Sequence, residues 1–220
     1  ESYAHGNHDV YKKPPVLNFE MHTALFGKGH RKEDCEYYRD VKKRLVKDSG
    51  NGFGYHFKRE DFYVYMLAHE YKHYTGGGTG LRSLLDIYVF LKHWREQADA
   101  LGQLRKSADG ALDGTALSEH ASGKNTSHIG KMGDRGNMTG QESVEGLDME
   151  YVQGELRKLG LTSFEQQGRH LAETVFGQVE EDRLTDDERW MRSYIFSSGT
   201  YGTKENSVAN RMRKMFGAGR

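Results

Sequence analysis

Two stretches of helical periodicity, separated by three glycines, constrain the fold of this chain more than any other feature. From Lys58 onwards, apolar and histidine side chains recur at spacings of three and four residues, so they share one face of an α-helix. The run Gly76–Gly78 should end this helix, because glycine has a large backbone entropy cost inside helices, and Thr79 can cap a second helix after it. The sequence therefore predicts a helix hairpin over residues 59–95. The two stripes consist of Phe62, Tyr65, Met66, His69 and His73, and of Leu81, Leu84, Leu85, Tyr88 and Leu91.

Alternating polar and apolar residues indicate a β-strand near the N-terminus. After Pro14-Pro15, the pattern within residues 9–26 comes close to a period of two, which places Glu20 and His22 on the same face of a strand. An upstream stretch, Tyr3–Tyr11, is expected to be its hairpin partner. Because helical periodicity returns at Leu147, we expect an α+β fold that is mostly helical. The expected C-terminal helices lie near residues 147–159, 164–176 and 186–196, followed by a short basic helix that carries Val208, Met212 and Phe216.

The same patterns divide the chain into four segments. Residues 1–30 hold the strands, and residues 31–97 form a helical region that contains the hairpin. Residues 98–146 are rich in Gly, Ser, Asp, Asn and Lys and have few large apolar residues, so they are expected to form a flexible insertion. Residues 147–220 are expected to form a C-terminal helical cluster.

Composition restricts the class of partner and compartment. Lysine plus arginine equals aspartate plus glutamate at 32 each, so there is no strong signal for nucleic-acid binding or for an anionic membrane surface. Cys35 is the single cysteine, which excludes an internal disulfide framework and a multi-thiolate zinc site and favours a reducing compartment. No apolar run approaches the roughly 20 residues of a membrane helix. A cytoplasmic protein without a membrane partner is the expectation.

The segment HEYKH, His69 to His73, fits the zinc-peptidase pattern HExxH. Two histidines one helical turn apart can chelate Zn²⁺, and Glu70 could then activate a metal-bound water as the base. The longer pattern of that class has a third histidine where Thr79 stands, so Asp86 or Glu96 would have to replace it. The alternative is that the histidines are partly buried polar residues of a helix hairpin, with Glu70 solvated or paired with Lys72 or Arg82. Short patterns match by chance, and this second interpretation is preferred.

Glu20 and His22 form a second candidate constellation. A strand carboxylate beside a hydrogen-bonding histidine is suited to holding a hard cation such as Mg²⁺ together with further carboxylates. The alternative is the solvated polar face of an edge strand, which the spacing alone favours.

Three segments resemble one known family. These are VLNFEMHTALF, FKREDFYVYMLAHEYKHYTGGGTGLRSLLDIYVFLK and SSGTYGT. They are similar to the uncharacterised bacterial nucleotidyltransferase family, whose members carry a strand of the form vElHw and then a helical hairpin of the form edlllhla.H..KH….lrwLlDi. The resemblance covers roughly residues 8–95 and 147–216, with 98–146 as an insertion. It spans more positions than HExxH, and that family has a His-x-x-Lys-His-type helix end without being a peptidase.

The resemblance implies a nucleotidyltransferase core in which Glu20 occupies the position of the third metal-binding carboxylate. In that fold a Gly-Ser turn and an Asp-x-Asp pair precede it, and three carboxylates hold two Mg²⁺ ions on the phosphates of a nucleoside triphosphate. Only nineteen residues precede Glu20, and they contain no such motif. Residues 1–30 are therefore expected to be the closing strands of the core. The chain is expected to start inside a longer protein or to be a truncated relative, inactive unless an N-terminal segment or a partner chain completes the site.

The remaining site predictions are less specific. The resemblance suggests that His22, His69, His73, Arg82 and Asp86 face a nucleotide or substrate cleft, although Arg82 and Asp86 also suit a local i, i+4 ion pair. SSGTYG could bind a phosphate through backbone N–H groups, but a turn between helices is preferred. The basic tail could contact RNA or a nucleotide, or be a solvated helix face. The sequence does not select the acceptor, which is a protein side chain, a small molecule or RNA. A further alternative is that the chain is a non-catalytic helical binding module.

Overall fold

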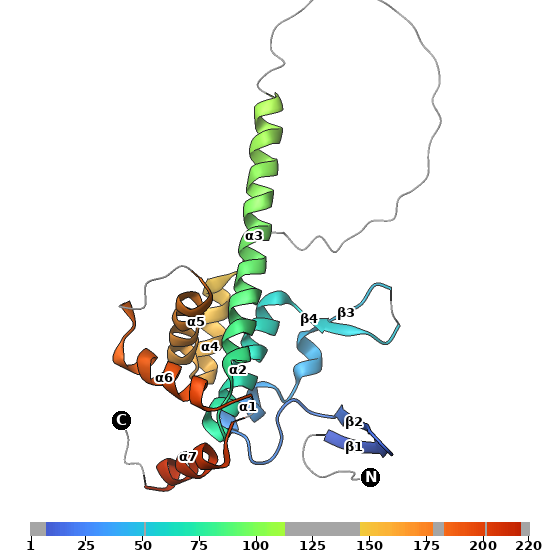
Figure 1. The fold of residues 1–220 in the computed structure, drawn as a ribbon. Helices are drawn as coiled ribbons and strands as arrows, with labels where there is room; N and C mark the ends of the chain where they lie inside the picture. The colour runs from blue at the N-terminus through green and yellow to red at the C-terminus, as the bar shows by residue number, and fades with distance from the viewer. Residues whose placement is uncertain (1–7, 51, 113–145, 178–182, 201, 217–220) are drawn as a thin grey trace, which may run out of the picture. The chain divides into compact units, whose positions relative to one another are not determined.

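The structure of the protein is a computed structural model that describes residues 8–50, 52–112, 146–177, 183–200 and 202–216 (Figure 1). The chain divides into two compact units, the first made of Glu1–Leu91 and Leu147–Arg220 and the second of Lys92–Gly146. The prediction of an α+β, mostly helical fold is confirmed. In chain order the described elements are β1 (His8–Lys13), β2 (Leu17–His22), α1 (Lys32–Tyr37), the 3-10 helix η1 (Val41–Arg44), β3 (Leu45–Lys47), β4 (Tyr55–Phe57), α2 (Arg59–Gly76), α3 (Leu81–Leu112), α4 (Met149–Leu159), α5 (Thr162–Phe176), α6 (Asp186–Ser197) and α7 (Lys204–Phe216).

The predicted helix hairpin forms α2 and the first part of α3. Acidic Glu60 and Asp61 lie in the first turn of α2, where the partial positive charge of a helix N-terminus favours them, and the helix ends at Gly76. Thr79 does not cap α3 through a backbone N–H; its hydroxyl is hydrogen-bonded to that of Ser83. The next helix then starts at Leu81.

The buried face of α2 is rotated from the predicted stripe, and that of α3 matches its predicted stripe in part. In α2 the fully buried residues are Tyr63, Val64, Leu67 and Ala68, and Phe62 is 44% exposed. In α3, Leu84 and Leu91 of the predicted stripe are buried together with Ile87. Two other members of that stripe, Leu81 and Leu85, are 42% and 41% exposed. Both sets obey helical spacing, so periodicity alone did not decide which face is buried.

The expected insertion is partly helical. α3 continues to Leu112, so residues 98–112 belong to a helix and not to a flexible segment. The reason is local: the run REQADALGQLRK at 95–106 consists mostly of strong helix formers, which the average composition of 98–146 conceals. Residues 113–145 lie outside the described residues. Within the second unit, a Cβ built on Gly146 would lie 3.7 Å from the Cβ of Ala98.

Two separate antiparallel hairpins supply the β-structure. β1 pairs with β2. It contains residues 8–11 of the predicted partner stretch Tyr3–Tyr11, whose residues 3–7 lie outside the described residues. The register places His8 opposite His22 and Val10 opposite Glu20. Every residue of β2 is exposed, so neither face of this strand is packed against the rest of the described protein. The second hairpin, β3 with β4, was not predicted, because strands of three residues carry no readable alternation.

Helices α4, α5 and α6 follow one another in the C-terminal part of the chain, and α4 and α6 begin with side-chain caps. The Asp148 side chain accepts from the Tyr151 N–H at the start of α4, and Gly160 ends that helix in the left-handed conformation at φ 63°. Thr185 and Glu188 form a reciprocal capping box at the start of α6. α4 packs on α1, α2 and α5, and α5 packs on α6.

The core of the first unit lies mainly between α2, α3, α4 and α5. Burying each of its leucine or isoleucine side chains contributes about 1.5–3 kcal/mol to folding. On one side of this core, Arg44 from η1 contacts Asp61 of α2 at 3.3 Å, Glu155 of α4 at 3.2 Å and the Tyr37 hydroxyl at 2.9 Å. Fully buried members of the core include Tyr63, Leu67, Leu84, Ile87, Leu156, Leu159 and Leu171.

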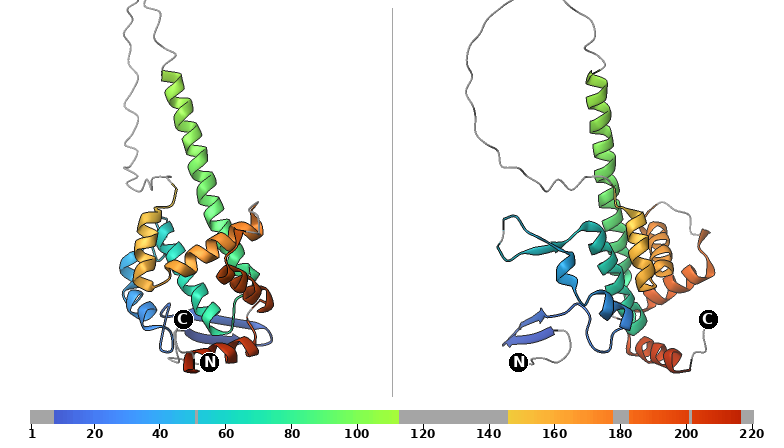
Figure 2. Two further views of the ribbon diagram at one scale, coloured as in Figure 1. Left: turned by 90° about the vertical axis from the view of Figure 1, so that its left-hand side faces the viewer. Right: turned by 180° about the vertical axis from the view of Figure 1, so that it is seen from behind.

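Two glycine-containing turns pack against each other backbone to backbone. A Cβ on Gly80 would collide with the carbonyl oxygen of Gly199, and the Thr203 N–H donates to the Gly77 carbonyl oxygen at 2.9 Å. The turn that contains Gly199 joins α6 to α7, which agrees with the preferred interpretation of SSGTYG. α7 packs on α2, and Figure 2 shows β1, β2 and α7 at the same end of the first unit.

No helix among the described residues has the length and apolar content needed to cross a membrane.

Candidate functional site

A pocket of about 480 Å³ lies where α2 ends and α3 begins. It brings together four of the side chains that the sequence predicts for a cleft, because the glycine turn folds the start of α3 back towards the end of α2. Thr200 reaches the same pocket from the turn before α7. The lining includes His69, Glu70 and His73 of α2, Arg82 and Asp86 of α3, and Thr200.

His69 and His73 form a contacting pair on one side of the pocket. Their Nε2 atoms are 3.3 Å apart and their rings meet edge to face. Burial, helped by the nearby charge of Lys72, lowers the pKa of His69 to about 4 and also lowers the pKa of His73. Both imidazoles are therefore neutral at neutral pH. One Nε2 donates to the other in the bond that joins them, which leaves a lone pair on Nδ1 of the donating ring and an N–H on Nδ1 of the accepting ring.

Glu70 is the most unusual side chain of the pocket. It is only 6% exposed, and among the described residues its Oε2 atom has no hydrogen-bond partner. Burial, followed by the negative charge of Asp86, raises the pKa of Glu70 well above its usual range. The expectation that Glu70 is solvated is therefore wrong, and Arg82 pairs with Asp86 instead, at 3.7 Å between Nε and Oδ2.

Arg82 is held only loosely by that ion pair. Its side chain is 81% exposed, and exposed pairs of this kind contribute little to stability. The guanidinium therefore stays available to an anionic group that enters the pocket.

The histidine pair has part of the geometry of a zinc site. Two nitrogens bound to tetrahedral zinc lie about 3.3 Å from each other, which matches the separation of His69 and His73. However, in the described chain the only group of three or more metal-binding side chains with ligand atoms within 4.8 Å of one another lies elsewhere. Glu70, Asp86 and Glu96 are thus not placed as a third ligand beside the two histidines.

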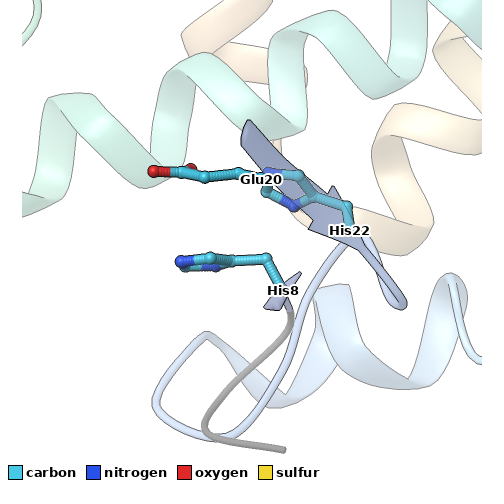
Figure 3. A group of neighbouring side chains, drawn as sticks. All are labelled: His8, Glu20 and His22. Atoms are coloured by element: carbon cyan, nitrogen blue, oxygen red, sulfur yellow. The ribbon is translucent and has the colours of Figure 1, made fainter. Parts of the chain in front are cut away.

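That group consists of His8, Glu20 and His22 on the β1–β2 hairpin (Figure 3). Glu20 and His22 are two residues apart on β2 and share a face, as the alternation predicts, and His8 is the cross-strand partner of His22. The His8 and His22 rings lie 5.2 Å apart between centroids. Glu20 accepts a hydrogen bond from the Asn18 side chain at 3.2 Å. Glu20 therefore lies in a strand, exposed to solvent.

The hairpin and the pocket are close enough to influence each other electrostatically. His22 and His30 are among the groups whose positive charge would lower the pKa of His69. His22 does not line the pocket itself, so the structure separates it from the other predicted cleft residues.

Sequence reasoning missed two contributors to these sites. His8 lies in the stretch that was expected to be the hairpin partner, and only the strand register reveals that it faces His22. Thr200 lies in the SSGTYG segment, and it reaches the pocket because the two glycine-containing turns pack against each other. Local sequence carries no signal for either meeting.

The comparison with known families agrees with the resemblance read from the sequence. The sequence profile of a family of uncharacterised nucleotidyltransferases matches residues 1–110, which is half of the chain. The match covers Glu20 and His22 as well as the α2 and α3 side chains of the pocket. No curated protein and no solved structure matches the chain. The chain belongs to the family of uncharacterised nucleotidyltransferases.

Proposed function

We propose that the chain serves in the transfer of a nucleotidyl group from a nucleoside triphosphate to an acceptor, with Glu20 as one carboxylate ligand of a divalent cation. The observation that carries the proposal is the family match, which spans Glu20 and the α2 and α3 side chains of the pocket. The cation would screen the phosphate charge that develops during in-line attack on the α-phosphorus. The acceptor is a protein side chain, a small molecule or RNA.

Glu20 fits the role of one oxygen ligand. It is exposed on β2, and Asn18 donates to its Oε1 atom, which orients the carboxylate. Mg²⁺ is usually bound by one or two carboxylates together with phosphate oxygens and water. Within the described residues no second carboxylate joins Glu20 in a group of ligands, so the set for two Mg²⁺ ions is incomplete there.

The pocket would hold and orient the nucleotide or its acceptor. Arg82 offers an exposed guanidinium for phosphate oxygens, and the neutral His69–His73 pair offers nitrogen atoms for hydrogen bonds to a ribose or base. Asp86 is held by Arg82 and would accept from hydroxyl or amino groups. Thr200 adds a hydroxyl from the turn before α7.

The test is magnesium-dependent nucleotide binding by the full chain. Fluorescent analogues of the four nucleoside triphosphates, titrated with and without Mg²⁺, should bind only when Mg²⁺ is present. Glu20→Gln keeps the size of the side chain but removes its charge, so it should weaken binding at least about tenfold. Glu150→Gln, an exposed substitution on α4, is the matched control and should bind like the wild type.

Two results would contradict the proposal: nucleotide binding that ignores Mg²⁺, or binding unchanged by Glu20→Gln. If nucleotide binding depends on Mg²⁺ and on Glu20 as expected, incubation with α-labelled nucleotides and candidate acceptors would identify the acceptor class. Absence of both nucleotide and metal binding would instead favour a non-catalytic helical module.

A zinc hydrolase is a second candidate, favoured by the 3.3 Å separation of the His69 and His73 nitrogens. Purified protein would then contain stoichiometric zinc that is lost in His69→Ala. Zinc-free protein with an unchanged fold would rule this candidate out.

A further inference from the structure

The hairpin β1–β2 gathers three metal-binding side chains on one face. His8 comes from β1, and Glu20 and His22 come from β2 (Figure 3). One ligand atom of each lies within 4.8 Å of those of the other two. The strand register fixes this arrangement, because directly opposed residues and residues two apart project from the same face of a sheet.

The spacing is close to that of a bound cation. Ligand atoms at about 2.0–2.2 Å from a transition metal are about 3 Å from each other when they occupy adjacent coordination positions. In the structure the three ligand atoms lie within 4.8 Å of one another, and the exposed side chains of Glu20 and His22 can turn towards the half-buried His8 ring.

The donor set selects the class of cation. Mg²⁺ and Ca²⁺ prefer oxygen ligands, whereas imidazole nitrogens suit first-row transition metals. Two histidines and one carboxylate on one face form the arrangement of a facial triad, which leaves the remaining positions on the metal open. On an exposed hairpin those open positions face solvent, where water or phosphate oxygens can occupy them.

We propose that His8, Glu20 and His22 form a binding site for a divalent transition-metal ion such as Zn²⁺ or Mn²⁺. The inference rests on the proposed function in that both use Glu20 as a cation ligand. It concerns the chain without nucleotide, where the two imidazoles beside Glu20 favour a transition-metal ion over Mg²⁺. A metal at this site cross-links β1 to β2, which otherwise pair as an exposed two-stranded hairpin of low intrinsic stability.

The test uses the full chain without nucleotide. Isothermal titration with Zn²⁺, Mn²⁺ and Mg²⁺ should give one site that prefers zinc and manganese over magnesium. His8→Ala should weaken zinc binding at least about tenfold, and Glu20→Gln should do the same. The matched control is His56→Ala, which removes an exposed histidine from the other hairpin, β3–β4, and should leave zinc binding unchanged.

A spectroscopic readout keeps the test independent of folding effects. Cobalt-loaded wild type should show a visible absorption band that changes in His8→Gln, a variant that keeps a polar side chain at the same position. Circular dichroism confirms that each variant is folded. Zinc binding unaffected by His8 substitution, or abolished by His69→Ala with His8 intact, would overturn the assignment.

The outcome separates this inference from the proposed function. If magnesium-dependent nucleotide binding occurs but zinc binding does not depend on His8, the inference fails and the proposed function stands. If zinc binds through His8 and no nucleotide binds under any metal condition, the inference stands and the proposed function fails.

Discussion

At the scale of single residues, Glu70 shows how burial controls the chemistry of the pocket. Its carboxyl is buried without a hydrogen-bond partner for Oε2 in the described protein, beside the charge of Asp86. Ionising such a group is unfavourable, since the lost hydration of the charge is not replaced. The folded protein therefore holds a proton at Glu70 that the unfolded chain releases more easily.

Glu70→Gln should stabilise the protein increasingly as pH rises. The pKa of Glu70 is higher in the folded state than its usual value of 4.5, so the wild type loses stability as pH rises above that value, until the folded-state pKa is passed. The amide keeps the shape of the acid and cannot ionise. The difference in free energy of unfolding between variant and wild type, measured in urea from about pH 5 to about pH 8, should grow in favour of the variant.

An exposed substitution serves as the control for this experiment. Glu150→Gln removes a carboxylate from the surface of α4 and should show no such growth with pH. A Glu70→Gln variant that is less stable than the wild type at every pH would mean that the carboxylate is ionised and satisfied in solution.

At the scale of elements, the packing of the two glycine-containing turns positions the pocket. Gly80 precedes α3 and lies against Gly199, and Gly78 has a φ of 104° that side chains disfavour. The sequence predicts that the glycines end α2. Gly80 lies outside the run Gly76–Gly78, and only its packing against the turn before α7 explains why it has no room for a side chain.

Gly80→Ala should destabilise the protein by about 2–4 kcal/mol, because the added methyl group collides with backbone that cannot move without separating the two turns. Gly76→Ala is the matched control in the same turn. A Cβ on Gly76 meets no atom within 4 Å, and alanine favours the last turn of α2, so its stability should equal or exceed that of the wild type. Thermal unfolding of both variants checks the difference, and equal melting temperatures would refute the close packing.

At the scale of the whole molecule, the buried hydrophobic residues of the described chain come from residues 26–91 and 147–198. None of them belongs to the second unit, Lys92–Gly146, among the residues whose burial is described. Gly146 and Ala98 lie side by side within that unit, so a short linker can join them.

Replacing residues 99–145 by a short Gly-Ser linker should leave the first unit folded. We expect cooperative thermal unfolding with a melting temperature within about 4 °C of the wild type, since no described core contact is removed. Loss of cooperative unfolding would show that the second unit supplies packing to the first. Magnesium-dependent nucleotide binding by the shortened protein would place the proposed site entirely in the first unit.

The sequence by itself determined the β1–β2 hairpin, most of the helices and the family. Periodicity and glycine punctuation located α2, the start of α3 and the four C-terminal helices α4 to α7, because these signals depend on near neighbours in the chain. The predicted membership of the uncharacterised nucleotidyltransferase family is confirmed by the match over residues 1–110. The nucleotide-binding roles of Glu20, His22, His69, His73, Arg82 and Asp86 stay predictions.

Only the tertiary structure decided which faces are buried and which residues meet. A helical stripe fixes the spacing of core residues but not the direction in which they point, so the buried face of α2 differs from the predicted one and that of α3 matches it only in part. The meeting of His8 with His22 depends on strand register, and the arrival of Thr200 at the pocket depends on contact between distant turns. Such contacts join residues far apart in the chain, and no local pattern specifies them.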